Sequence, residues 1–380
     1  MDGSCYVIDL DANKETYIPY SSVFKNLQTI ILETNNESLI GTITELQVFN
    51  GLIFVLDAHI AKGLFVFNTD GKFLNKIGGI GGGPGEYSRI YDFTIDTDNQ
   101  CVFLLVQGSR VHKYEFDGTY MSSINIQLQN TNSYFIQYYN GRLYSSIIAW
   151  EPQKDDCMLV EINPENGKIL SQTLPIKFNK GWAKGGFTGN RFFMSRLNSP
   201  PRYTQMFMDY IVSIDERISP YIELKSKYLF TNKELENLPD GLSIREILRH
   251  FQGVTKIWDV NSFIENDDFI IFRCGSGIDL SDYFSVIFNK KTEEVKLAKK
   301  LKNDLILRRV DDEKSVMSVM SGRFIFSDIN GAYEMIPPMI FAQFKNSIRN
   351  NEIVSDLDKL DQIMQLNDDS NPIIFYYEYK

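Results

Sequence analysis

The sequence predicts an all-β fold, a six-bladed β-propeller with small helical insertions. Two observations lead to this prediction: a hairpin-like pattern recurs along the chain, and the spacing of its copies is close to the length of a four-stranded blade. Hydrophobic residues make up 43% and aromatic residues 13% of the 380 residues, which is enough apolar material for a buried core. Because repeat architectures hold chains of this length in one body, we expect residues 1–380 to form a single propeller.

The repeated pattern is an apolar strand that ends in Asp or Asn, a polar turn and a second strand. Each copy predicts a β-hairpin, because alternating apolar strands flank a turn made of residues that tolerate positive φ. The first copy, at residues 6–18, predicts a hairpin close to the N-terminus. The intervals between copies range from 46 to 59 residues, except the last, which is 74. The residues that mark the six copies are Asp9, Asn68, Asp117, Asn163, Asp215 and Asn289.

Two segments break the strand pattern and predict helices. The long last interval contains a helical insertion at residues 229–258, where Thr231 with Glu234 and Ser243 with Glu246 form two capping boxes. A second helical segment is expected at residues 338–366, before the last strand, with Ser355 as a helix cap.

The two ends of the chain are expected to complete one shared blade. Residues 371–380 read as an isolated strand with no hairpin partner downstream, and the first copy of the repeat begins almost at the N-terminus. Pairing the two ends would remove the free sheet edges that otherwise promote aggregation.

Residues 67–105 carry the most specific motif of the sequence. This segment combines an Asp70-Gly71 turn, the turn at residues 83–87 and a following strand that contains Asp92 and Phe93. Together with the aromatic strand at the C-terminus, it resembles the six-bladed β-propeller lipoproteins of bacterial envelopes, which are relatives of NHL-repeat proteins. The resemblance implies a protein of the bacterial cell envelope, periplasm or cell surface.

Charge and hydropathy limit the partners. Lys and Arg number 39 against 49 Asp and Glu, a net charge of -10 that repels phosphate backbones, so we expect no nucleic-acid partner. No apolar run approaches the roughly 20 residues that cross a bilayer, so we expect no transmembrane span. The lipoprotein resemblance implies a lipidated cysteine, but Cys5 follows no apolar signal segment, so we expect that segment to be absent from this sequence. We expect a monomer.

Catalytic and metal-binding motifs are sparse. No G-x-S-x-G motif is present, and His59, His112 and His250 have no His or carboxylate neighbour at metal-ligand spacing. We expect no cofactor, although calcium stays open because Asp96 and the nearby Asp98 and Asn99 offer oxygen ligands. The alternative is a metal-dependent hydrolase or lyase with a site at the central channel mouth, since sequence spacing does not exclude ligands contributed by several blades.

The sequence therefore favours a binding or scaffolding module, with a glycan or a peptide as a plausible ligand. The glycine-rich stretch at residues 78–87 lacks the Gly-Lys-Ser/Thr of a phosphate loop and predicts a tight crossover between blades. If that loop instead faces a ligand, its contacts would be Glu86, Tyr87 and Arg89. Aromatic rings stack on sugars and arginines bind carboxylates. The other candidate binding residues are Trp150, Trp182, Arg202, Tyr203, Trp258 and Arg273.

Overall fold

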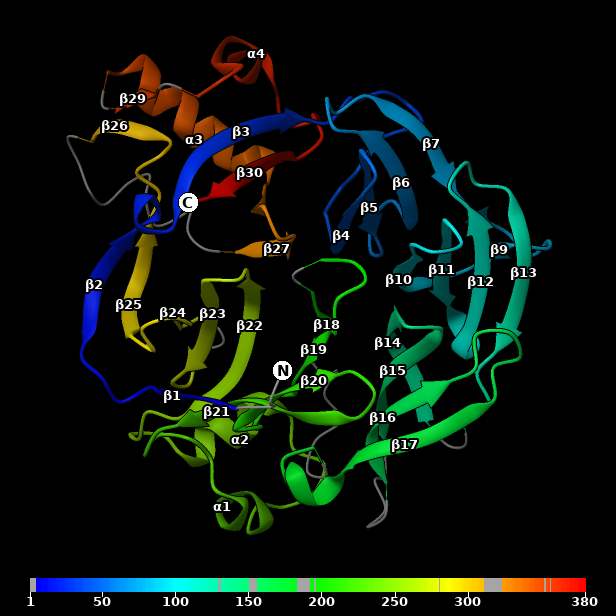
Figure 1. The fold of residues 1–380 in the computed structure, drawn as a ribbon. Coiled ribbons are helices and arrows are strands. Elements are labelled where there is room, and N and C mark those ends of the chain that lie inside the picture. The colour runs from blue at the N-terminus through cyan, green and yellow to red at the C-terminus, as the bar shows by residue number, and fades with distance from the viewer. Residues whose placement is uncertain are drawn as a thin grey trace.

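Six β-sheets stand around a central axis in the computed structural model of the chain (Figure 1). This arrangement confirms the predicted six-bladed β-propeller. The structure describes residues 5–128, 131–149, 156–182, 192–194, 196–279, 281–310, 323–351, 353–355 and 357–380.

The first three blades follow each other along the chain, and each is a four-stranded antiparallel sheet. Blade 1 contains β4 (Glu45–Phe49), β5 (Leu52–Asp57), β6 (Gly63–Asn68) and β7 (Phe73–Ile77). Blade 2 contains β10 (Ile90–Asp96), β11 (Cys101–Val106), β12 (Arg110–Glu115) and β13 (Tyr120–Asn125). Blade 3 contains β14 (Thr131–Tyr139), β15 (Arg142–Ala149), β16 (Cys157–Ile162) and β17 (Ile169–Pro175).

Blades 4 to 6 use the N-terminal strands as well. Blade 4 contains β18 (Phe192–Phe193), β19 (Arg202–Tyr203), β20 (Tyr210–Ile214), β21 (Ile218–Lys225) and β1 (Tyr6–Asp9). Blade 5 contains β22 (Ile257–Glu265), β23 (Phe269–Ser276), β24 (Tyr283–Asn289), β25 (Val295–Lys302) and β2 (Lys14–Pro19). Blade 6 contains β27 (Phe324–Ser327), β28 (Gly331–Ile336), β30 (Ile373–Tyr379) and β3 (Phe24–Ile31).

Five of the six predicted hairpins are present, and each supplies two adjacent strands of a blade. They are β6–β7, β12–β13, β16–β17, β20–β21 and β24–β25. The turn of the first lies against the preceding blade, because Glu33 N donates to Gly71 O at 2.8 Å. Gly71 has φ of +88°, and a Cβ there would lie 2.0 Å from Ile31 O, so the turn requires glycine.

The hairpin predicted at residues 6–18 is wrong. Strand β1 pairs in parallel with β21, and β2 pairs in parallel with β25, so the two strands join different blades. Between them the Asp9 carboxylate accepts from Asp11 N, which holds the chain in a local turn without reversing it onto itself. The outer edges of blades 4 and 5 offer unpaired backbone groups, and these two strands pair with them.

The expected shared blade is blade 6, but β3 joins the C-terminal strand there instead of the first repeat at residues 6–18, which lies in blades 4 and 5. Strand β3 pairs antiparallel with β30, with Leu27 opposite Tyr377 and Ile31 opposite Ile373. Strand β30 is fully inside the sheet, because β28 pairs with its other edge. The N-terminal strands thus lie along the outer edges of three consecutive blades (Figure 1).

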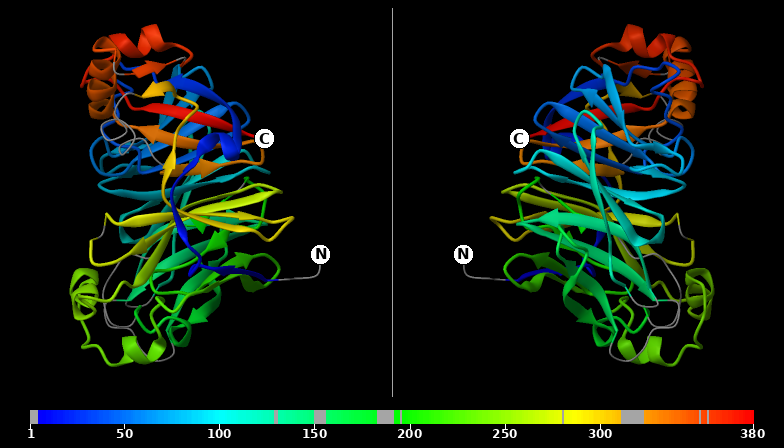
Figure 2. Two further views of the ribbon diagram at one scale, coloured as in Figure 1. Left: turned by 90° about the vertical axis from the view of Figure 1, so that its left-hand side faces the viewer. Right: turned by 90° about the vertical axis from the view of Figure 1, so that its right-hand side faces the viewer.

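The helices occur in the two expected ranges. Helices α1 (Asn232–Glu236) and α2 (Ile244–His250) begin with the two capping boxes, in which Thr231 Oγ1 accepts from Glu234 N at 3.2 Å. Helices α3 (Pro338–Arg349) and α4 (Leu360–Gln365) precede β30. In the edge-on views of Figure 2 the helices gather on one face of the ring, and the C-terminus lies towards the other face.

The helix cap predicted at Ser355 is wrong. Ser355 ends β29 (Ile353–Ser355), which pairs with β26 (Leu307–Val310), and its hydroxyl donates to Ile306 O at 2.8 Å. Helix α4 begins five residues later, after Lys359 in the left-handed region at φ of 58°. Ser355 thus belongs to a short strand and not to the helix start that the local sequence pattern predicted.

Candidate functional site

A cavity of about 860 Å³ lies where the inner strands of five blades converge. Strands β4, β14, β18, β22 and β27, which lie towards the central axis in Figure 1, contribute residues to its wall. Phenylalanine side chains line part of the wall, and charged and amide side chains line the rest. The cavity is therefore the candidate binding site of the fold.

Strand β22 brings several polar side chains to this wall. Its pairing with β23 shifts register twice, between Ile257 and Asp259 and again after Asn261, and Ser262 has φ of 51°. Such bulges re-aim side chains relative to the regular alternation of a strand. Asp259, Asn261 and Ser262 all line the cavity, although the flanking residues of the strand are apolar core.

Arg273 lies beside this group, because the register of blade 5 places it opposite Asn261. Its guanidinium carbon is 4.7 Å from the centroid of the Tyr283 ring, which is a cation–π contact. The Tyr283 hydroxyl donates to Asp259 Oδ2 at 3.5 Å, and Asn261 Nδ2 donates to the same oxygen at 3.0 Å. Arg273, Tyr283, Asp259 and Asn261 therefore form one contiguous polar cluster.

Arg323 adds a second guanidinium from the neighbouring blade, just before β27. Burial lowers the pKa of Arg273, and the charge of Arg323 lowers it further, so the two cations lie within electrostatic reach of each other. Burial also raises the pKa of Tyr283 to about 12, with Asp259 acting in the same direction and both arginines opposing it. All of these charges therefore act on the space around Tyr283.

Glu334 is a buried carboxyl group on the same wall, in β28. Its Oε2 accepts from the Tyr377 hydroxyl at 2.9 Å and from the Tyr20 hydroxyl at 3.4 Å, and Arg323 N donates to Oε1 at 3.2 Å. Burial raises the pKa of Glu334 to about 7, more than these hydrogen bonds and the charge of Arg273 lower it. The group therefore changes charge near neutral pH.

The residues predicted in the glycine-rich loop do not reach the cavity. Strands β8 (Gly79–Ile80) and β9 (Glu86–Tyr87) form a small parallel pair, and Glu86 Oε2 accepts from Gly83 N at 2.7 Å within the loop. Tyr87 is fully buried, and its hydroxyl donates to Lys62 O. Arg89 N donates to Gln107 Oε1 at 3.1 Å. The loop is thus a packed connection between blades 1 and 2.

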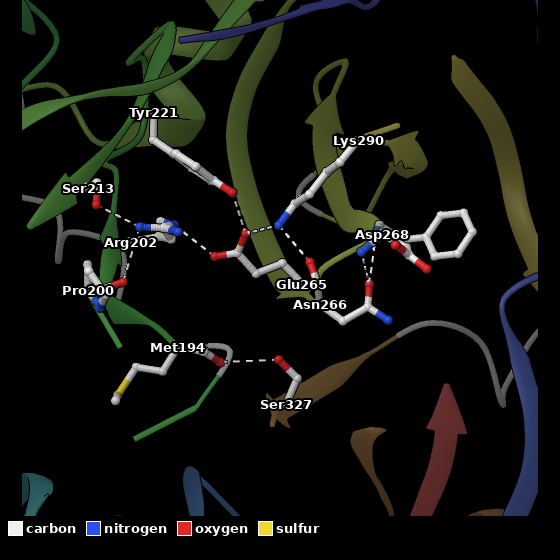
Figure 3. A network of polar contacts seen from close by, with 11 residues as sticks. Met194, Pro200, Arg202, Ser213, Tyr221, Glu265, Asn266, Asp268, Lys290 and Ser327 are labelled. Carbon is white, nitrogen blue, oxygen red and sulfur yellow. Dashed lines mark hydrogen bonds and ion pairs between the residues drawn. The ribbon is translucent and has the colours of Figure 1, made fainter. Parts of the chain in front are cut away.

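Arg202 belongs to a closed ionic network between blades 4 and 5 (Figure 3). Arg202 Nε contacts Glu265 Oε1 at 2.8 Å, and Lys290 Nζ contacts Glu265 Oε2 at 2.8 Å. The Tyr221 hydroxyl donates to Glu265 Oε2 at 2.6 Å. Burial opposes ionisation of Glu265, but the charges of Arg202 and Lys290 hold its pKa below the ordinary value. This network ties two blades together.

The predicted aromatic residues are mostly interior. The Tyr203 hydroxyl is within 2.8 Å of Ser146 Oγ inside the core. Trp182 and Trp258 are each 3% exposed and pack in the cluster that includes α1 and α2. Trp150 lies outside the described residues. Among the predicted residues that are described, Arg273 lines the cavity.

The turn considered for calcium is held by its own hydrogen bonds. Asp96 Oδ1 accepts from Asp98 N at 3.1 Å and from Asn99 N at 3.0 Å. Within the described ranges, no group of three or more His, Cys, Asp and Glu side chains is arranged to hold a metal ion. The same ranges contain no helix that is long and apolar enough to cross a membrane.

Comparisons with known proteins agree with the propeller fold. The chain is similar to the crystal structure of a “putative exported protein” from Bacteroides fragilis, with a TM-score of 0.74 and 15% identity, over 99% of this chain and 100% of that one. It is also similar to a member of the DUF4221 family from Bacteroides vulgatus, with a TM-score of 0.52 and 10% identity, over 94% of this chain and 97% of that one. At these identities the similarity shows the fold alone.

No curated protein matches the chain. A family model does match, over residues 5–378, which is nearly the whole sequence. The chain therefore belongs to the family described as Domain of unknown function (DUF4934).

Proposed function

We propose that the protein is a binding module of the bacterial envelope that holds a small glycan or peptide ligand in its central cavity. The observation that carries this proposal is the cavity itself. Its volume of about 860 Å³ falls within the range of small-molecule sites, and polar and aromatic side chains line it together. A rigid ring of blades with a lined centre suits recognition, because the scaffold fixes the side chains before the ligand arrives.

A location outside the cytoplasm is part of the proposal. The similar Bacteroides fragilis structure is named as an exported protein, and the segment at residues 67–105 resembles envelope lipoproteins. Fractionation of the native bacterium tests this point, and we expect the protein in the envelope fraction. Recovery in the cytosolic fraction would contradict the proposed location without touching the binding site.

The binding proposal is tested with glycan and peptide arrays on the wild type and two tryptophan variants. Asn261→Trp places a large side chain in the cavity, whereas Leu74→Trp places the same side chain on β7, where Leu74 is exposed. We expect array binding by the wild type and by Leu74→Trp, and its loss in Asn261→Trp. Equal binding by both variants, with unchanged thermal unfolding, would place the binding site elsewhere and reject the proposal.

A further inference from the structure

The two arginines of the cavity wall lie close to each other without a counter-charge in direct contact. Among the residues that the structure describes, no carboxylate forms an ion pair with Arg273 or Arg323. The charge of the exposed Arg323 lowers the pKa of the partly buried Arg273, because like charges repel. A bound anion would relieve that repulsion and would accept charge-assisted hydrogen bonds from both guanidinium groups.

The two guanidinium groups fit a carboxylate. Arg273 and Arg323 are the cations among the described residues that line the cavity, and the carboxyl groups of the same wall are Glu45, Asp259 and Glu334. A carboxylate brings one negative charge in the planar geometry that a guanidinium binds through two parallel hydrogen bonds. A phosphate monoester brings close to two charges and would meet repulsion from Asp259.

The groups next to the arginines suit the rest of a sugar acid. Asp259 and Asn261 offer acceptors and a donor within one hydrogen-bonded cluster, and Ser262 adds a hydroxyl. The cavity lining also includes Phe135 and Phe193, which are partly buried, and the Phe193 ring stacks on Phe263 with ring centroids 5.4 Å apart. Aromatic rings of this kind stack on the C–H face of a sugar. Alternating hydroxyl and C–H surfaces are a general feature of saccharides, and this wall presents a partner for each.

A buried hydrogen-bond acceptor on the cavity wall also favours a ligand with hydroxyl groups. Gln47 is 4% exposed and lines the cavity, and its Nε2 donates to Phe93 O at 3.2 Å. Its Oε1 has no hydrogen-bond donor among the described residues. A buried acceptor without a partner costs about 1–3 kcal/mol, which a ligand hydroxyl would recover.

We infer that Arg273 and Arg323 form a carboxylate subsite and that the ligand of the cavity is an acidic saccharide with a uronate group. This inference rests on the proposed function, because it names the ligand class of the same cavity. The arginines bind the carboxylate, and the Asp259, Asn261 and Gln47 side chains bind hydroxyls.

The test uses titration calorimetry with digalacturonic acid, its neutral dimethyl ester and the dipeptide Glu-Glu as probes. The proteins are the wild type, Arg273→Gln, Arg323→Gln and, as a matched control, Arg110→Gln, which removes an exposed arginine of blade 2. We expect the acid to bind at least about tenfold more tightly than the ester, and both cavity variants to lose about tenfold or more in affinity for the acid. The control variant should bind like the wild type.

Each other outcome rejects a defined part of the inference. Equal affinity for acid and ester, unchanged in both cavity variants, overturns the carboxylate subsite. Binding of Glu-Glu but not of digalacturonic acid overturns the saccharide and makes the ligand an acidic peptide. If no acidic probe binds, the inference falls, while the proposed function stands so long as Asn261→Trp still abolishes array binding.

Discussion

Glu265 and Glu334 each lie near two cations, but their pKa values shift in opposite directions. Glu265 lies between Arg202 and Lys290, each at 2.8 Å, and its pKa is held low. Glu334 has Arg273 within electrostatic reach and Arg323 next to it, but its direct side-chain partners are tyrosine hydroxyls and its pKa rises to about 7. The two glutamates therefore differ in whether they contact cations directly. Glu265 forms a closed network with its cations, whereas the arginines near Glu334 keep their guanidinium groups for a ligand.

The largest expected effect comes from breaking the closed network. Glu265→Gln leaves Arg202 and Lys290, whose side chains are 13% and 12% exposed, without their buried counter-charge. We expect a loss of about 3–5 kcal/mol in the free energy of unfolding, measured by urea denaturation at neutral pH. The matched control is Glu161→Gln, which removes the more exposed pair with Arg142 and should cost less than about 1 kcal/mol. Similar losses in the two variants would contradict a structural role for the Glu265 network.

The second largest expected effect is on the pH dependence of folding stability. The pKa of Glu334 rises from its ordinary value of 4.5 to about 7 in the folded protein, so the folded state binds the proton more tightly. Its contribution to stability is complete below pH 4.5 and is lost as pH rises through about 7, a change of roughly 3 kcal/mol. The groups that face this carboxyl are Tyr20, Tyr377, Arg273 and Arg323.

The variant Glu334→Gln isolates the contribution of Glu334 ionisation to stability, because glutamine keeps an acceptor for Tyr377 and never ionises. Thermal unfolding of wild type and variant at pH 5.5, 7 and 8.5 should give a stability difference that grows with pH in favour of the variant. Parallel curves for the two proteins would show that Glu334 ionises normally. Glu265 has the opposite sign, since its lowered pKa makes its contribution disappear as pH falls below its ordinary range.

The smallest expected effect concerns metal ions. If the arginines organise the cavity, thermal unfolding in EDTA, in calcium and in zinc should agree, with differences below about 1 kcal/mol. A variant that changes Asp96 to Asn serves as a probe of the turn considered for calcium. A marked rise of the unfolding midpoint with one metal, lost in that variant or in Asp259→Asn, would locate an ion site and favour the hydrolase or lyase alternative.

The fold was predictable because its signals are local. The hairpins of blades 1 to 5 were predicted from turns such as Asp70-Gly71, and the capping boxes at Thr231 and Ser243 predicted two helices. The error at residues 6–18 arose where pairing is not local. An alternating strand pattern indicates a strand but says nothing of its partner, and β1 finds its partner in β21.

Of the candidate binding residues that the structure describes, Arg273 is the one that lines the cavity. Arg273 was a candidate because arginines bind the carboxylates of ligands, but Asp259 and Asn261 reach the cavity through bulges that no short pattern reveals. Arg323 and Glu334 come from another blade, so their proximity to Arg273 depends on ring closure. Tyr87 and Tyr203 show the converse, because in a chain this rich in aromatic residues most rings pack inside.

The path of the first strands also sets the order of assembly. Strands β1, β2 and β3 precede blade 1 in the sequence, whereas their partners β21, β25 and β30 all follow blade 3. Blades 1 to 3 are complete within their own contiguous sequence and are able to form during synthesis, whereas blades 4 to 6 must wait for contacts of high sequence separation. The ring therefore closes as a late, slow event, and the cavity with its two arginines is complete only once β30 has paired with β3.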